Sequence, residues 1–153
     1  MINFEYYTPT RVVFGKDTEK ETGRLVKEQG CQKVLLHYGG QSAKKSGLLG
    51  RIEESLKEAG VEYISLGGHW QRPKGVYFVS YYAPAGTAKR ALELCKEAGV
   101  DFILAVGGGS VIDSAKAIGY GVANEGDVWD IYSRKREAEA CLPIGAVLTI
   151  AAA

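Results

Sequence analysis

Three consecutive glycines separate an apolar run from an amphipathic run in the middle of the chain. The stretch DFILAVGGGSVIDSAKAIG covers residues 101–119, and Gly107, Gly108, Gly109 and Ser110 form its centre. Glycine has no Cβ atom, so its backbone can approach a ligand closely. Where such a turn opens a helix, free N–H groups and the helix dipole attract an anion such as a pyrophosphate. The turn chemistry alone leaves two interpretations open, a phosphate site and a structural tight turn.

The residues around this turn carry more specific expectations. We expect Ser110 to cap the following helix, with Asp113 completing a variant of the capping box. We expect Gly109 to lie where the backbone approaches the pyrophosphate and where helix meets strand. The spacing differs from the G-x-G-x-x-G fingerprint, because the third glycine position falls on Ile112.

A second pair of glycines follows another apolar run. In HYGGQS, Gly39, Gly40 and Ser42 come directly after a predicted strand. Backbone N–H groups and a hydroxyl suit a further phosphate. A carboxylate at this strand end would bind a ribose 2′-OH and repel a 2′-phosphate. No acidic residue is present here, which favours NADP over NAD; a glycine-terminated strand that merely feeds a loop is the alternative.

Elements that would position these turns alternate along the chain. Short β-branched runs predict strands over 11–15, 33–40, 61–68 and 101–108. Amphipathic runs predict helices over 17–30, the second half of 42–60, 87–99 and 110–123. Near-continuous apolar strands that alternate with helices are typical of a parallel sheet covered on both faces. We therefore predict one α/β domain over 1–153, a doubly wound Rossmann-like parallel sheet with helices on both faces.

One segment interrupts this alternation. HWQRPKGVYFVSYYAPAG, residues 69–86, stands where a short connection is expected. Its centre is aromatic and β-prone, and Pro and Gly flank it on both sides. We interpret it as an atypical insert that adds a strand or hairpin. A partner- or ligand-binding loop and an engineered segment stay open as alternatives.

Composition excludes several classes of function. Nineteen basic and eighteen acidic residues leave a net charge of +1, so we expect neither nucleic acid nor a membrane surface as partner. Three widely spaced cysteines are typical of reduced thiols. The first residues lack the apolar core of a signal peptide, and no apolar run reaches the roughly 20 residues of a membrane span. We expect a cytoplasmic protein.

Other candidates for chemistry are few. His37 and His69 are the two histidines, with no cysteine or carboxylate at ligand spacing, so we expect no metal site within this chain. His37 lies in an apolar strand and is interpreted as a core or rim histidine whose ring nitrogens have hydrogen-bond partners. Asp127 is expected to cap a short helix. No residues form a nucleophile–base set, so no catalytic residue is predicted.

Several of these stretches together resemble one known family. YYTPTRVVFGK, KVLLHYGGQS, DFILAVGGGSVIDSAKAI, EGDVWDIY and LPIGAVLTIAA are similar to the N-terminal half of iron-containing (group III) alcohol dehydrogenases, especially the butanol-dehydrogenase-like branch. The resemblance implies NAD(P)-dependent interconversion of alcohols and aldehydes. It places the pyrophosphate at the 107–110 turn, Asp113 near the nicotinamide ribose and Thr149 near the nicotinamide end. It also matches Gly39, Gly40 and Ser42 to a G-G-x-S that accepts a 2′-phosphate in NADP-using members.

The chain also departs from the family pattern. In the family, an Asp and three His of a C-terminal helical domain hold the catalytic metal, Fe or Zn, and this sequence stops at LTIAAA before any of them. Ala153 stands where the family has a cofactor-binding threonine, and 69–86 replaces a shorter loop. We therefore expect a cofactor-binding half without the metal. The alternative is a non-catalytic truncated, chimeric or engineered domain that at most binds a nucleotide or a partner. Whether a homodimer covers the face left by the absent half stays open.

Overall fold

A computed structural model describes residues 8–67 and 85–149 of the chain. Within these ranges the chain alternates between short helices and strands. In chain order the elements are η1 (Thr18–Glu21), α1 (Thr22–Lys27), β1 (Lys33–Tyr38), α2 (Gln41–Lys45), α3 (Leu48–Glu58), β2 (Glu62–Gly67), α4 (Ala85–Ala98), β3 (Phe102–Gly107), α5 (Gly109–Ala123), α6 (Val128–Tyr132) and β4 (Ile144–Leu148).

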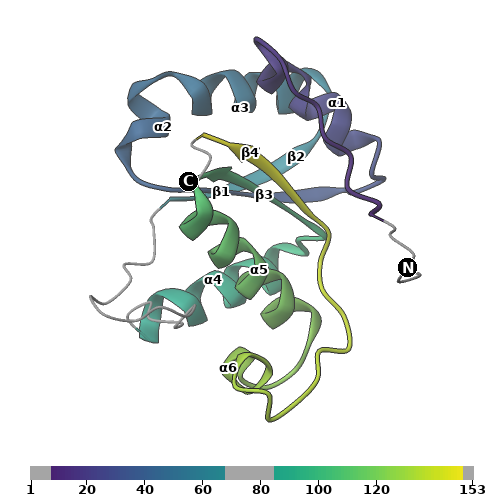
Figure 1. Ribbon diagram of the computed structural model, residues 1–153, viewed down its shortest axis with the longest axis vertical. Coiled ribbons are helices and arrows are strands. Elements are labelled where there is room, and N and C mark those ends of the chain that lie inside the picture. Colours follow the sequence, from purple (N-terminus) through teal and green to yellow (C-terminus); the bar gives the residue numbers. More distant parts are fainter. Residues whose placement is uncertain (1–7, 68–84, 150–153) are drawn as a thin grey trace, which may run out of the picture.

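The four strands form one all-parallel sheet in the order β2-β1-β3-β4. The first strand, β1, lies in the interior of this sheet. From it the chain continues to the edge strand β2, returns past β1 to β3 and then reaches the other edge strand, β4. The direction of winding therefore reverses between β1 and β3. Figure 1 shows α1, α2 and α3 on one side of the sheet and α4, α5 and α6 on the other. The α/β prediction, with a parallel sheet and flanking helices, is confirmed.

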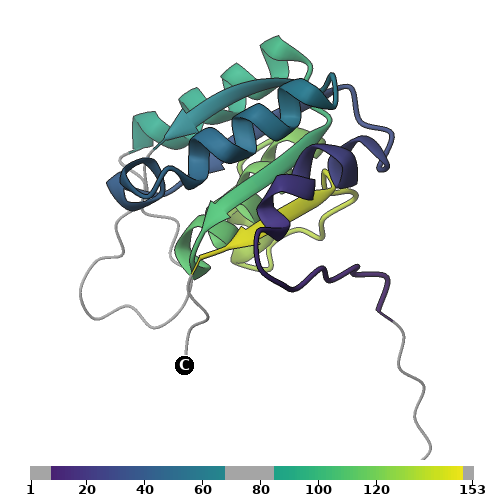
Figure 2. The same cartoon turned by 90° about the horizontal axis from the view of Figure 1, so that it is seen from above.

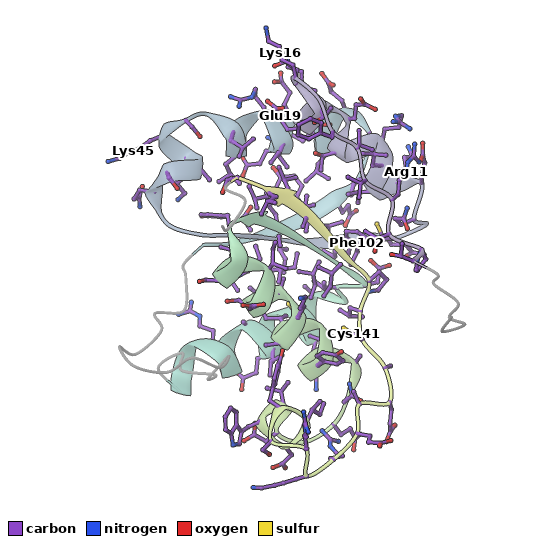
Figure 3. All side chains as sticks on the ribbon, viewed as in Figure 1. Arg11, Lys16, Glu19, Lys45, Phe102 and Cys141 are labelled. Atoms are coloured by element: carbon purple, nitrogen blue, oxygen red, sulfur yellow. The ribbon has the colours of Figure 1, made fainter. Side chains whose placement is uncertain are left out.

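Two hydrophobic clusters hold the helices to the sheet. Alternate side chains of a strand point to opposite faces, so Leu36 and Leu104 pack against α3 while Leu35 and Ile103 pack against α4 and α5. Every residue of β3 is buried, which explains why its sequence is apolar without alternation. Phe102, labelled in Figure 3, begins this strand and is 4% exposed.

The helix faces agree with the apolar spacing of the sequence. Leu49, Ile52 and Leu56 of α3 are buried, and Ala91 and Cys95 of α4 are buried as well. The predicted terminator after α3 is confirmed, because Gly60 has φ +69 there, a conformation that glycine adopts without steric cost.

The predicted strand over 11–15 is wrong. This segment contains no strand, and it leaves Val12 80% and Phe14 99% exposed. Arg11 instead forms an ion pair with Glu28 of 2.8 Å, beside α1 in Figure 3. β-Branched residues favour a strand only where a neighbouring strand and a buried face are available, and no described strand pairs with this segment.

Two further expectations concern the insert over 69–86 and membrane-spanning helices. The predicted extra strand or hairpin over 69–86 lies outside the described residues, except that its last two residues begin α4. Among the helices that the structure describes, none combines the length and the apolar character needed to cross a bilayer.

Candidate functional site at the carboxyl edge of the sheet

The carboxyl ends of β1 and β3 lie side by side in the sheet. Tyr38, the last residue of β1, is in register with Val106 of β3. The N–H of Gly39 then donates a hydrogen bond of 3.3 Å to the carbonyl oxygen of Val106. The two glycine turns that the sequence singled out therefore start next to each other, at the position where the winding of the sheet reverses. Open α/β sheets bind their ligands at such reversal points, outside the carboxyl ends of the strands.

Val111, in the first turn of α5, lies against both glycine turns. A Cβ atom on Gly107 would lie 2.6 Å from Cγ2 of Val111, closer than side-chain carbons approach one another. A Cβ atom on Gly39 would lie 3.1 Å from the same methyl group. The fold therefore requires glycine at 107, because α5 starts immediately beneath it, and favours glycine at 39. The expectation that Gly109 fills the position where helix meets strand is wrong, since Gly107 fills it.

Gly108 and Gly109 have a different surrounding. A Cβ atom on either would meet no described atom within 4 Å. Packing within the described protein therefore does not explain these two glycines. Open space above them is what a ligand in contact with the backbone would need.

The N–H groups of Gly109 and Ser110, at the start of α5, have no acceptor among the described residues, whereas that of Val111 donates to the carbonyl oxygen of Gly108. Gly108 is the N-cap residue, and no side chain caps the helix. The first N–H groups of a helix have no acceptor within it, and α5 is 15 residues long, so its dipole adds to the attraction for an anion. The predicted cap at Ser110 is wrong, because the N-cap is Gly108 and Ser110 is the second residue of the helix. Its side chain is exposed at the same edge.

The other predicted site residues also lie at this edge. Thr149 follows β4, and its N–H donates a hydrogen bond of 3.2 Å to the carbonyl oxygen of Gly107. Asp113 is half-buried one turn into α5, while Gly40 and the exposed Ser42 begin α2 directly after β1. Figure 2 shows β3 and β4 side by side with their arrowheads at this edge. The structure thus gathers around one edge the residues of all the predicted groups: Gly39, Gly40, Ser42, Gly107, Gly108, Gly109, Ser110, Asp113 and Thr149.

Three residues at this edge were not predicted. The ring of Tyr38 lies on Gly67, where a Cβ atom would come within 2.5 Å of ring atoms. The Nζ atom of Lys44 lies 5.1 Å from the centroid of that ring. The one available signal was the pair of lysines in the short segment after Ser42. The partners of Tyr38 depend on which strand lies beside β1, and local sequence does not encode that.

His37 lies in β1 beneath the first glycine turn and is 1% exposed. Its Nδ1 lies 3.1 Å from the carbonyl oxygen of Leu66. A carbonyl can only accept, so Nδ1 carries the proton and Nε2 is the bare nitrogen of the neutral ring. Nε2 is buried and has no partner among the described residues. Burial lowers the pKa of His37, against the smaller opposite effect of the Leu66 carbonyl. The interpretation as a core histidine is confirmed by this burial, but the expectation that both ring nitrogens have partners is wrong for Nε2 within the described residues.

Metal ligands do not gather in the described residues. Within 8–67 and 85–149, no three His, Cys, Asp or Glu side chains form a group that could hold a metal ion. We assign no metal chemistry to these residues.

The fold defines a class, the α/β domains that have a parallel sheet with helices on both faces. Comparison with known families identifies the branch within it. The sequence profile of the iron-containing alcohol dehydrogenases matches residues 9–153. The chain belongs to the iron-containing alcohol dehydrogenase family.

Relatives in several bacteria are similar to nearly the whole chain. It is 44% identical to the probable NADH-dependent butanol dehydrogenase 2 of Bacillus subtilis, over 99% of this chain and 36% of that protein. It is 36% identical to the NADPH-dependent aldehyde reductase YqhD of Escherichia coli, over 99% of this chain and 36% of that protein. The crystal structure of NADH-dependent butanol dehydrogenase A from Thermotoga maritima matches with a TM-score of 0.85 and 41% identity, over 98% of this chain and 35% of that one. The chain therefore spans little more than a third of these relatives.

Proposed function

We propose that this chain is the dinucleotide-binding part of an NAD(P)H-dependent oxidoreductase that interconverts alcohols and aldehydes. In this proposal its sheet is a doubly wound, Rossmann-like domain. The observation that supports this proposal is the pair of glycine turns. They lie side by side where the winding of the sheet reverses, and Val111 lies against both. Family membership and the names of the relatives support the same assignment. The activity belongs to a protein of the relatives' length, of which this chain corresponds to about 36%.

The fit of a dinucleotide to this edge rests on the glycines. Gly107 leaves no room for a side chain, so the backbone turns sharply into α5. Gly108 and Gly109 then leave open space above the free N–H groups of that helix. We assign the pyrophosphate to the turn from Gly107 to Ser110. A bound nicotinamide would supply hydride transfer, and the residues of this chain would bind and orient it.

The remaining assignments are those that the family resemblance implies. We place Asp113 near the nicotinamide ribose and Thr149 near the nicotinamide end, and both residues lie on the β3–β4 side of the turn. We place the 2′-phosphate of NADP(H) near Gly39, Gly40 and Ser42, on the β1 side. The iron that the family name implies would be held outside the described residues.

The choice between NADP(H) and NAD(H) rests on the residues at the end of β1. The names of relatives point in both directions, since the 44% identical protein is named as NADH-dependent and the 36% identical one as NADPH-dependent. No carboxylate follows β1 between Gly39 and Ser46, so nothing in that segment repels a 2′-phosphate. We therefore propose that the chain prefers NADP(H).

Calorimetric titration with NADPH and with NADH tests both the site and the preference. Wild-type protein is expected to bind NADPH more tightly than NADH. Gly109→Val fills the open space and is expected to weaken both cofactors at least about a hundredfold, roughly 3 kcal/mol. The free energy of unfolding should change little, within about 0.5 kcal/mol, because the helix start is exposed there.

Gly50→Val is the matched control for this variant. Gly50 is exposed on α3 and also has no described atom within 4 Å of a Cβ position, so cofactor binding should be unchanged. If folded Gly109→Val binds both cofactors as wild type does, the three glycines form a tight turn only and the proposal fails. Equal or tighter binding of NADH by the wild type would refute the preference alone.

A further inference from the structure

The end of β2 is covered by an aromatic ring from the neighbouring strand. Tyr38 and Gly67 are in register as the last residues of β1 and β2. A Cβ atom on Gly67 would lie 2.5 Å from Cε2, Cζ and Oη of Tyr38. Glycine at 67 therefore allows the ring to approach the backbone closely. Dinucleotide-binding sheets place either a carboxylate for the ribose 2′-OH or a cation for a 2′-phosphate at the end of the strand beside the phosphate turn, which is β1 here.

A cation is present beside this ring. The ammonium of Lys44 lies 5.1 Å from the centroid of Tyr38, a distance at which the ring face attracts it. No ion pair joins Lys44 to a residue that the structure describes, and no carboxylate lies between Tyr38 and Ser46 in the sequence. The ring thus holds a positive charge near the first glycine turn without neutralising it.

The next residue offers a direct comparison. Lys45 is also exposed on α2, and Figure 3 shows its side chain pointing away from the fold. The two lysines contribute the same charge to the same short helix. Lys44 contacts the Tyr38 ring, and no such contact is recorded for Lys45 among the described residues.

We propose that Lys44, positioned by the ring of Tyr38, determines the preference for NADP(H) over NAD(H) by binding the 2′-phosphate. The inference rests on the proposed function and adds a residue to it. An ammonium forms strong charge-assisted hydrogen bonds with a phosphate and much weaker ones with a neutral hydroxyl. Lys44 therefore acts on one cofactor and leaves the other nearly unaffected, whereas the 107–110 turn serves the pyrophosphate that both share.

Lys44→Ala and Lys45→Ala, each titrated with NADPH and NADH, test this role. Lys44→Ala is expected to weaken NADPH about tenfold and to change NADH by less than about twofold. Lys45→Ala should leave both affinities within about twofold of wild type, because its side chain points away from the fold. Tyr38→Leu should weaken NADPH about threefold, since an exposed cation–π contact is worth roughly 0.5–1 kcal/mol. Circular dichroism establishes that each variant is folded.

The outcomes separate this inference from the function on which it rests. A selective loss of NADPH affinity in Lys44→Ala alone supports it. Equal effects of Lys44→Ala and Lys45→Ala would overturn the inference, because the effect would then come from general surface charge. A parallel loss of both cofactors in Lys44→Ala would also overturn it, because Lys44 would then serve the pyrophosphate or the fold. If wild-type protein binds neither cofactor, the proposed function fails first and the inference falls with it.

Discussion

The two glycine turns at the carboxyl edge look alike in sequence and differ in construction. The turn after β3 leads into α5, which has 15 residues, whereas the turn after β1 leads into α2, which has 5. A long helix offers free N–H groups and a dipole, but a very short one offers mainly its side chains. The β3 turn is thus suited to bind an anion through backbone, and the β1 turn through side chains such as Ser42 and Lys44.

The layers beneath the two turns also differ. His37 of β1 is in register with Ala105 of β3. The first turn therefore lies over a buried imidazole and the second over a methyl group. A Cβ atom on Gly107 would lie 2.6 Å from Cγ2 of Val111, whereas a Cβ atom on Gly39 would lie 3.1 Å from the same methyl group. The comparison teaches that the fold depends strictly on one glycine of the β3 turn, while the β1 turn has more freedom.

The largest expected effect on stability separates Gly107 from its neighbours. Gly107→Ala forces a methyl group against Val111, and such overpacking lowers the free energy of unfolding by about 1–3 kcal/mol. Gly109→Ala is the control, because its Cβ enters open space, and it should change stability by no more than about 0.5 kcal/mol. Urea unfolding of both variants measures the difference.

Val111→Ala sharpens this test. In the Gly107→Ala background it removes the methyl group that causes the clash, so the two substitutions together should cost less than the sum of each alone. Additive losses, or equal stability of Gly107→Ala and Gly109→Ala, would show that the close approach at Gly107 does not constrain the turn.

Much of the fold follows from local patterns in the sequence. The apolar runs of β1 and β3, and the spacing of Leu49, Ile52 and Leu56, predict buried strands and an amphipathic helix because burial dominates there. The segment 11–15 carries the same β-branched signal but is exposed, because no described strand pairs with it. A strand depends on a partner that its own residues do not specify.

The candidate site was predictable in kind and less so in detail. The glycines marked both turns, since few other roles place three of them before a helix. The contact of Val111 with Gly39 depends on the strand order, which brings residues about 70 positions apart together, whereas its contact with Gly107 is local. The ring of Tyr38 on Gly67 depends on the same order. The N-cap of α5 was predicted two residues too late. Serine is a common capping residue, which favoured Ser110, but the N-cap is Gly108.

An intermediate effect is expected from the buried histidine of β1. The pKa of His37 is lowered from 6.5 by burial. Below pH 6.5 the unfolded chain takes up a proton that the folded chain does not, so stability falls as the pH drops from 6.5 toward the folded pKa. The slope in this window reaches at most about 1.4 kcal/mol per pH unit.

His37→Asn isolates this contribution. Its amide can still donate to the carbonyl of Leu66 but does not titrate, while the carboxylates remain as a common background. Unfolding free energies from pH 7.5 down to 5 should therefore decline less steeply in the variant. Parallel profiles for the two proteins would mean that His37 titrates alike in the folded and unfolded chain.

The smallest expected effect compares two helix starts. Asp127 caps α6, since its carboxylate accepts a hydrogen bond of 2.9 Å from the N–H of Trp129. Asp127→Ala should thus lower the free energy of unfolding by about 1 kcal/mol. Ser110→Ala removes an exposed hydroxyl that caps nothing, so its effect on stability should stay below about 0.5 kcal/mol. Its effect on cofactor binding should be the larger one, a loss of a few-fold from one fewer donor to the pyrophosphate. Thermal unfolding and calorimetry on the same preparations measure both quantities. A destabilised Ser110→Ala that binds NADPH normally would return this serine to the role of a cap and remove it from the site.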